Sequence, residues 1–230
     1  MRSPIARPLA VITRIATVFV AVWALWLLLG VGTPQFSLAG FAYYTSLTNL
    51  LGLVWALIVL GVTVGRVTRS GWRGSASVAP RTGAAVAAAI FITMLIYLVI
   101  LAPTAFTMDT GYEPFTLSDN LVHIVVPTLV ILDWALYAKK GQLRWFDPLL
   151  WALIPYSYMA FALIRPVLSE APLPHGGNYP YPFLNVDELG AGGVAAGIAW
   201  LSVAIFTILF LFVALDRWLG RLARRRNSLA

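Results

Sequence analysis

The sequence has no cysteine, only two histidines and few charged residues. Without cysteine the chain forms no disulfide bond, carries no thiolate nucleophile and has no Cys-ligated metal site. Two histidines and no dense cluster of carboxylates argue against a structural metal, and we predict no cofactor. Charged residues make up 11% of the chain, whereas an ordinary soluble domain is about 25% charged.

The 230 residues are instead 60% hydrophobic, with a mean hydropathy of +0.83. A soluble core of this size does not absorb so much apolar surface, so lipid is the expected solvent. A membrane-spanning helix needs roughly 20 mostly apolar residues. Six runs meet that length, and they are about Leu9–Gly30, Phe41–Val64, Thr82–Pro103, Leu121–Ala138, Leu149–Leu168 and Gly192–Leu215. The sequence therefore predicts an all-α fold, a single polytopic membrane domain of six transmembrane helices over residues 1–230.

The basic residues lie on one side of the predicted membrane. The N-terminal segment, the second and fourth loops and the C-terminal tail hold 15 of the 16 lysines and arginines. By the positive-inside rule this side is cytoplasmic. The protein is therefore predicted to span the cell membrane with both termini in the cytoplasm. The net charge of +7 therefore indicates orientation rather than nucleic-acid binding. We expect the basic tail, residues 217–230, to rest on anionic membrane lipids.

The two longer outer loops are rich in proline and aromatic residues. They cover residues 102–120 and 166–189, and the second contains Tyr179, Tyr181 and Phe183. Such loops are stiff, so we expect them to cover the outer face, with Tyr181 and Phe183 placed over a bound substrate. The alternative is a plain aromatic belt at the level of the headgroups.

A polar stripe marks the outer end of the second predicted span. Thr45, Thr48, Asn49 and Gly52 are three or four residues apart and therefore share one helix face. Small and hydroxyl residues let membrane helices approach closely and form hydrogen bonds, which gives a structural explanation for Thr48 and Asn49. Thr45 has a second explanation, which depends on the residue expected opposite it.

That residue is His123, about two residues inside the fourth predicted span, which also enters from the outer side. At about 1.5 Å of rise per residue, His123 and Thr45 both lie within roughly 6 Å of the outer end of the apolar layer. Histidine can act as a general base, and a threonine hydroxyl needs such a base to become a nucleophile. The pair could attack an ester carbonyl, with Asn49 or backbone N–H groups stabilising the oxyanion. The alternatives for His123 are a structural hydrogen bond and haem ligation.

Two further residues in the fourth span bear on this hypothesis. Pro127 crowds the carbonyl of His123 and predicts either a bend that makes room for a polar cavity or an ordinary kink. Asp133 lies roughly 15 Å deeper than His123 and about 80° around the helix, so it does not complete a triad. Asp133 can have a structural role, in which it forms a hydrogen bond to a residue at its own depth: Thr93, Ser157 or Tyr158. The alternative is a role as a proton relay.

Arg165 is the one basic residue near the outer side. It can extend its guanidinium to the surface or pair with an outer-loop acid. It can also bind a carboxylate or phosphate of the substrate, because the guanidinium is a planar fork of donors. The outer-loop acids that could pair with Arg165 are Asp119, Asp187 and Glu188.

Three stretches resemble a known membrane family. They are Tyr44–Leu50 (YTSLTNL), His123–Pro127 (HIVVP) with Asp133, and Leu163–Arg165 with Tyr179–Val186 (YPYPFLNV). The chain resembles the bacterial branch of the six-span family that includes the androgen-dependent TFPI-regulating protein and the androgen-induced protein. Its eukaryotic members are integral-membrane hydrolases of fatty acid esters of hydroxy fatty acids, with a threonine nucleophile and a histidine. The resemblance implies that Thr45 is the nucleophile and His123 the base.

The leading prediction is therefore a membrane hydrolase of lipid esters with its site in the outer half of the bilayer. Thr45 and His123 are its predicted catalytic residues, and Asn49, Arg165, Tyr181 and Phe183 are its predicted substrate-binding residues. Thr48 and Asp133 are predicted to be structural. One alternative is a non-enzymatic protein that binds or transports a lipid or small molecule, and another is a structural or regulatory membrane subunit.

Overall fold

The computed structural model describes residues 6–105, 114–169, 173 and 177–228. Every regular element in these residues is helical. Six helical stretches are long and apolar enough to cross a membrane, which confirms the all-α fold and the six predicted spans. The stretches are Ala6–Leu28, Tyr44–Ser70, Pro80–Leu101, Leu117–Tyr137, Asp147–Leu168 and Val186–Arg225.

Three of the spans are divided into shorter helical elements. The first two spans are α1 (Ala6–Leu28) and α2 (Tyr44–Ser70), and the last is α9 (Val186–Ser228). The other elements, in chain order, are the 3-10 helix η1 (Leu38–Ala42), α3 (Pro80–Ile96), η2 (Tyr97–Leu101), α4 (Ala102–Ala105), α5 (Leu117–Asn120), η3 (Leu121–Val125), α6 (Val126–Tyr137), α7 (Asp147–Trp151), α8 (Leu153–Leu168) and the 3-10 helix η4 (Pro182–Leu184).

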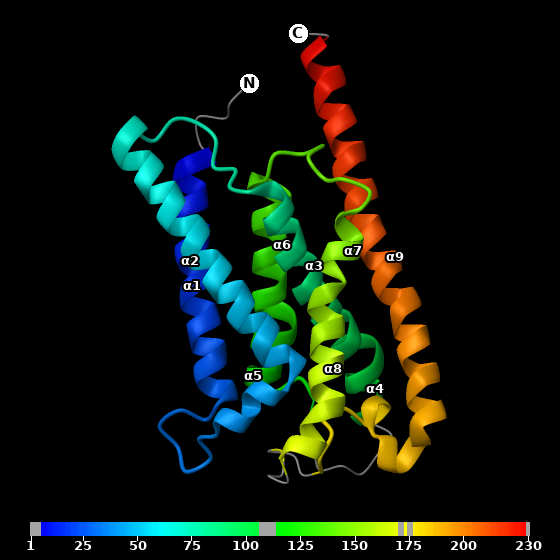
Figure 1. Cartoon of the computed structure of the whole chain (residues 1–230). Helices are drawn as coiled ribbons and strands as arrows, with labels where there is room; N and C mark the ends of the chain where they lie inside the picture. The colour runs from blue at the N-terminus through cyan, green and yellow to red at the C-terminus, as the bar shows by residue number, and fades with distance from the viewer. Residues whose placement is uncertain (1–5, 106–113, 170–172, 174–176, 229–230) are drawn as a thin grey trace.

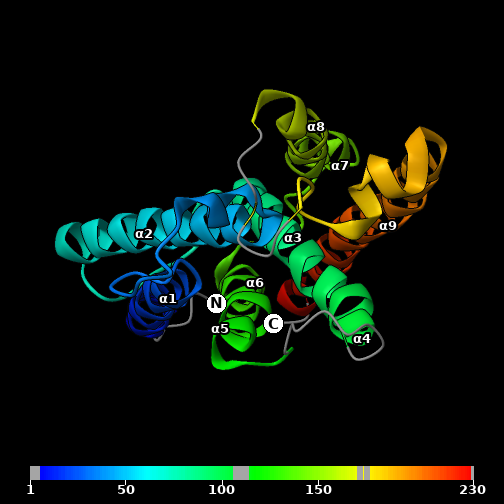
Figure 2. The same cartoon turned by 90° about the horizontal axis from the view of Figure 1, so that it is seen from below.

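The spans form an upright bundle with α3 and α6 in the middle (Figure 1). The helices α1 and α2 pack together on one side, while α9 packs against α3 and α7 on the other. The start of α1 and the end of α9 lie at the same end of the bundle, which we call the termini end. Seen along the bundle, α1 lies beside α6, whereas α8 stands on the far side of α2 and α3 (Figure 2).

Polar and apolar side chains are distributed as in a protein surrounded by lipid. Large apolar side chains are exposed along all six spans; Val167 is 85% exposed and Trp200 is 77% exposed. Arg14, Asn49 and Asp216 are buried instead. In water, charged residues are almost never fully buried unless they are paired, and large exposed apolar patches are rare. This distribution, with the six apolar spans, indicates a multi-pass membrane protein.

Two spans contain a π-helical turn, in which each N–H bonds to the carbonyl five residues back. The turns are η2 and η3, and they close with the N–H groups of Ala102 and Val126. The next residue in each case is a proline, Pro103 or Pro127. Proline has no N–H and its ring crowds the carbonyl four residues earlier, so the regular hydrogen-bond ladder cannot continue there. The disturbance that the sequence predicts at Pro127 takes the form of this wide turn.

The prediction that Asp133 forms a hydrogen bond to Thr93, Ser157 or Tyr158 is wrong. Its carboxylate pairs with Arg14, with 2.6 Å between Arg14 Nε and Asp133 Oδ1, and this ion pair is largely buried. Thr93 and Tyr158 bond elsewhere, to Thr48 and to the carbonyl of Ala42. The reason is lateral packing, because α6 lies beside α1 rather than beside α8.

The basic tail is helical as far as Ser228 and packs against the fourth loop. Arg217 donates a hydrogen bond of 3.2 Å to the carbonyl of Leu143. Gly220 touches the loop so closely that a Cβ atom there would lie 2.6 Å from the Cα of Gly141. A side chain at position 220 therefore meets backbone, which cannot move aside as a flexible side chain can.

We expect Gly220→Ala to lower the free energy of unfolding by about 1–3 kcal/mol, the usual effect of overpacking. Gly61→Ala is the matched control, because a Cβ at that helical glycine has no neighbour within 4 Å. Alanine favours the helix over glycine by roughly 0.5–1 kcal/mol, so this control is expected to be neutral or stabilising. Thermal unfolding in detergent measures both variants. Equal melting temperatures would contradict the close approach of α9 to the loop.

The described part of the second outer loop covers the end of the bundle opposite the termini. Tyr181 and Leu184 are buried there as part of the larger apolar core. The ring of Tyr181 meets that of Tyr43 edge to face, with centroids 6.0 Å apart. Residues 177–185 thus form a cover, as predicted, and not a belt of exposed aromatics. Residues 106–113, 170–172 and 174–176 of the two outer loops lie outside the described residues.

Candidate functional site

Thr45 and His123 meet at the end of the bundle opposite the termini. Thr45 lies in the first turn of α2 and His123 in the π-helical turn η3. The hydroxyl oxygen of Thr45 and Nε2 of His123 are 3.2 Å apart, and both side chains are buried. The proximity that the sequence predicts from their similar depth is therefore confirmed. Their catalytic role stays a prediction.

The second ring nitrogen of His123 determines its tautomer. Nδ1 is 3.2 Å from the backbone carbonyl oxygen of Asp119. A carbonyl oxygen only accepts hydrogen bonds, so Nδ1 carries the hydrogen and Nε2 carries the lone pair. The hydroxyl of Thr45 consequently donates to Nε2. This is the arrangement in which a histidine accepts the proton of a nucleophile.

The carboxylate next to His123 belongs to Asp119. Asp119 Oδ1 is 3.8 Å from His123 Nδ1, and Thr116 donates a hydrogen bond of 3.1 Å to the same carboxylate. A negative group at this place stabilises the imidazolium that forms when Nε2 takes a proton. From the sequence, Asp119 is predicted only as a partner of Arg165. The missed signal is the spacing of four residues between Asp119 and His123, which places them on one helix face.

An aromatic ring fixes the plane of the imidazole. The rings of Tyr97 and His123 are stacked, with centroids 3.9 Å apart and planes 6° apart. Tyr97 is fully buried, and its hydroxyl accepts a hydrogen bond of 2.8 Å from the backbone N–H of Phe115. The two rings project from the two π-helical turns, η2 and η3. Such turns occur frequently at functional sites, and here they bring Tyr97 against His123.

Asn49 holds the two halves of the pair in position. Its side-chain amide donates one hydrogen bond of 2.8 Å to the carbonyl of Thr45 and another of 2.9 Å to the carbonyl of Val122. Both amide hydrogens are thereby used, and the remaining Oδ1 is an acceptor. Asn49 thus links α2 to η3 by hydrogen bonds. The amide hydrogen that the sequence predicts for an oxyanion is already used in these bonds.

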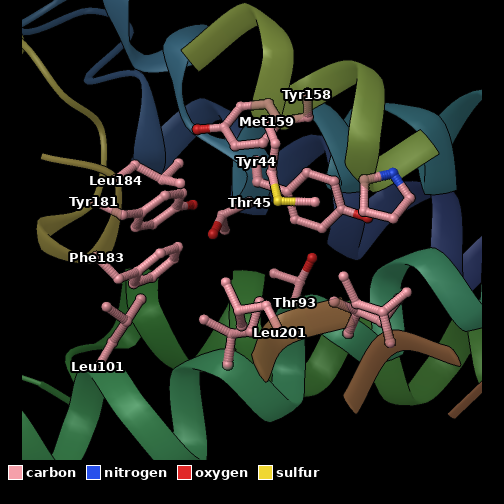
Figure 3. Close-up of a pocket in the computed structure, with 14 residues that line it drawn as sticks. Tyr44, Thr45, Thr93, Leu101, Tyr158, Met159, Tyr181, Phe183, Leu184 and Leu201 are labelled. Atoms are coloured by element: carbon pink, nitrogen blue, oxygen red, sulfur yellow. The ribbon is translucent and has the colours of Figure 1, made fainter. Parts of the chain in front are cut away.

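An apolar cavity adjoins Thr45 (Figure 3). The space inside it that a water-sized molecule can occupy is about 30 Å³, so the cavity is narrow. Its walls come from α2, α3, η2, α8, α9 and the loop before α9. The polar groups among the described lining residues are the hydroxyls of threonines and tyrosines. Thr45 is the lining residue that also contacts His123. Ligand pockets of this kind are mostly apolar, with a few polar groups that orient the ligand.

The predicted substrate-binding residues lie in different places. Tyr181 and Phe183 line the cavity, with their rings stacked 5.2 Å apart. Arg165 is absent from the described lining and donates a hydrogen bond of 3.1 Å to the carbonyl of Asn178. This contact joins α8 to the covering loop. The substrate-binding role of Arg165 stays a prediction.

Thr48 and Thr93 connect α2 to α3 beside the cavity. Their hydroxyl oxygens are 2.8 Å apart, and the hydroxyl of Thr48 also lies 3.0 Å from the carbonyl of Tyr44 in its own helix. Both residues are buried. The contact is of the helix-packing kind that small hydroxyl residues provide in membranes.

No group of three or more His, Asp or Glu residues within the described part of the chain is placed to hold a metal ion. No protein-family model matches the chain, and neither a curated protein nor a solved structure matches it.

Proposed function

We propose that this protein is an integral membrane hydrolase of lipid esters, in which Thr45 is the nucleophile and His123 the general base. The observation that carries the proposal is the contact of 3.2 Å between the Thr45 hydroxyl and His123 Nε2 beside an apolar cavity. Threonine is a weak nucleophile by itself, and a neutral imidazole within hydrogen-bonding distance supplies the base that it needs.

The cavity supports a substrate with a hydrocarbon chain. Its described wall combines aliphatic and aromatic side chains, and along the third span it extends from Ile92 in α3 to Leu101 in η2. Nine residues of helix span roughly 14 Å, so an alkyl chain with its ester carbonyl at Thr45 would follow this wall. We expect the narrow cavity to widen when such a chain binds. The resemblance of the Thr45 and His123 stretches to hydrolases of fatty acid esters supports the same chemistry.

The reaction proceeds in two halves. In the first, Thr45 Oγ1 bonds to the carbonyl carbon and its proton passes to His123 Nε2. The bond from that carbon to the alcohol oxygen then breaks, and the imidazolium gives its proton to the departing alkoxide. In the second half, water attacks the acyl-threonine, Nε2 takes a proton from the water, and Oγ1 leaves and recovers that proton. The products are an alcohol and a fatty acid, and the enzyme returns to its starting state.

The proposal includes an orientation in the cell membrane. The segments at the termini end contain 15 of the 16 basic residues, so the positive-inside rule makes this end cytoplasmic. The site then lies in the outer half of the bilayer, where the substrate is a membrane lipid or reaches the cavity from the membrane. Binding at this depth also shields the first tetrahedral intermediate from bulk water, which strengthens the electrostatic interactions that stabilise it.

A fluorophosphonate probe tests the nucleophile directly. Thr45 Oγ1 is expected to displace fluoride and form a stable phosphonyl ester, which mass spectrometry of the purified protein locates. Thr45→Val keeps the shape of the side chain but removes the hydroxyl, so labelling and ester turnover are expected to fall to background. Thr207→Val is the matched control, because Thr207 lies on the exposed surface of α9.

Retained labelling and turnover in Thr45→Val would overturn the proposed nucleophile. A wild-type protein that takes up a lipid ester in its cavity, but neither hydrolyses it nor reacts with the probe, would identify a binding or transport protein instead. Both results come from the same preparations, since ligand uptake and covalent labelling are measured separately.

A further inference from the structure

Tyr181 is the polar side chain of the covering loop that faces the nucleophile. It is 8% exposed and lines the cavity, and its hydroxyl points toward Thr45 (Figure 3). A phenol directed at a nucleophile in the wall of an apolar cavity lies next to the place that the carbonyl oxygen of a bound ester would take.

The ring of Tyr181 is fixed by its neighbours on several sides. It stacks on Phe183 with planes 4° apart, and it meets Tyr43 and Tyr158 edge to face with centroids 6.0 and 6.2 Å away. The loop itself is closed by a hydrogen bond of 3.0 Å from the N–H of Leu184 to the carbonyl of Tyr181. The hydroxyl is therefore held in place before a substrate binds, as preorganised stabilisation of charge requires.

The Tyr181 hydroxyl lies at the N-terminal end of α2, where the helix dipole is positive. The Thr45 side chain and the backbone N–H groups of Thr45 and Tyr44 lie within hydrogen-bonding reach of the Tyr181 hydroxyl, and the two N–H groups donate toward its oxygen. The first N–H groups of a helix have no carbonyl partner within it, and residue 43 provides no side-chain cap to α2. Tyr158 uses its hydroxyl hydrogen on the carbonyl of Ala42, at 3.0 Å. The hydroxyl of Tyr44, the third tyrosine of the described lining, donates to the carbonyl of Ala89 at 3.4 Å. Tyr181 is thus the tyrosine of this lining that can direct its hydrogen toward the reacting carbonyl.

The protonation state of Tyr181 agrees with a donor role. Burial raises the pKa of its hydroxyl above the ordinary value, an effect larger than the opposing one of the nearby N–H groups. The phenol consequently stays neutral and keeps its hydrogen across the pH range in which a histidine base works.

We propose that Tyr181 is the oxyanion donor of this site, with its hydroxyl oxygen held by the first N–H groups of α2. This inference rests on the proposed hydrolase function. The carbonyl oxygen of the ester lies beside the Tyr181 hydroxyl, on the side of the cavity. When Thr45 Oγ1 bonds to the carbonyl carbon, the electron pair of the C=O bond moves to this oxygen. The Tyr181 hydroxyl then donates a hydrogen bond to it without transferring its proton, and the oxygen reforms the double bond when the alcohol leaves.

Tyr181→Phe tests the proposal, because it keeps the ring and its stacking and removes only the hydroxyl. Loss of one oxyanion donor is expected to lower kcat by about 10²–10³-fold with little change in KM, since the donor acts on charge present only in the transition state. The rate at which fluorophosphonate labels Thr45 is expected to fall as well, because the phosphonyl oxygen occupies the same position. The control is Tyr179→Phe in the same loop, which does not line the cavity.

Replacement of Tyr181 by fluorinated tyrosines gives a second readout that a purely structural role would not change. A more acidic phenol is a stronger donor, so kcat is expected to stay far above that of Tyr181→Phe and to vary with phenol acidity. A Tyr181→Phe variant with a kcat within twofold of the wild type would overturn this inference and leave the hydrolase proposal intact. Absence of turnover and of Thr45 labelling in the wild type would overturn both.

Discussion

Replacement of His123 by glutamine is expected to lower kcat/KM for ester hydrolysis by about 10²–10⁴-fold, the usual contribution of a positioned general base. Glutamine has a similar size and still forms hydrogen bonds, but it does not take up the proton of the Thr45 hydroxyl. The contact that it removes is the one of 3.2 Å between Thr45 and Nε2. Turnover of long-chain and aryl esters by the protein in nanodiscs measures the effect.

The matched control for this substitution is His175→Gln, the same chemical change at the other histidine of the sequence. It is expected to keep wild-type turnover. Slow phosphonylation of Thr45 by the probe in His123→Gln would agree with loss of the base, since the hydroxyl is still present. If His123→Gln kept at least a third of the wild-type kcat/KM, the imidazole would have no role as base, and its contact with Thr45 would be structural.

The second large effect is expected at the buried ion pair of Arg14 and Asp133. Asp133→Ala leaves the guanidinium of Arg14 buried without its carboxylate, and removal of one partner of a buried pair costs about 3–5 kcal/mol of stability. Arg14 is only 2% exposed. Its guanidinium also donates hydrogen bonds to the carbonyls of Val59 and Ala76, each at 3.2 Å, and to the hydroxyl of Thr63. The residue thereby connects α1, α2, α6 and the second loop, so its loss loosens the whole termini end.

A double variant separates the interaction between Arg14 and Asp133 from the contacts that each residue makes with other groups. Arg14→Met with Asp133→Leu removes both charges and fills the space with apolar atoms, and such replacements are often neutral or stabilising. Unfolding of the two single variants and the double variant in detergent gives the coupling free energy between the positions. We expect the double variant to be more stable than either single one. Strict additivity of the two losses would show that the ion pair does not couple α1 to α6.

Part of the site follows from the sequence, because depth in a membrane is obtained by counting residues. The spans must each cross the same apolar layer, so a residue near the start of one descending span lies level with its counterpart in another. This relation placed Thr45 and His123 together, and the structure brings them to 3.2 Å. Besides depth, the prediction used one assumption, which is that the second and fourth spans are neighbours in the bundle.

Rotation around the helix axis and lateral neighbours do not follow from counting. Asp133 illustrates this, because depth alone offered Thr93, Ser157 and Tyr158, whereas the packing of α1 against α6 selects Arg14. Asn49 is a second case. Its place on the polar stripe is visible in the sequence, but only the structure shows that the carbonyls of Thr45 and Val122 take both of its amide hydrogens.

The sequence by itself determined the solvent of this protein, its six spans and the level at which its polar residues lie, because apolar content and run length must match the lipid layer. Only the tertiary structure decided which groups touch at that level. The π-helical turns rotate Tyr97 and His123 into a stack, Asp119 reaches the imidazole from one turn away, and α8, α9 and the covering loop close a cavity against Thr45. The physical reason is that the apolar surfaces of membrane helices are nearly equivalent in lipid, so their pairing is set by close packing and by a few buried polar contacts that composition and spacing leave open.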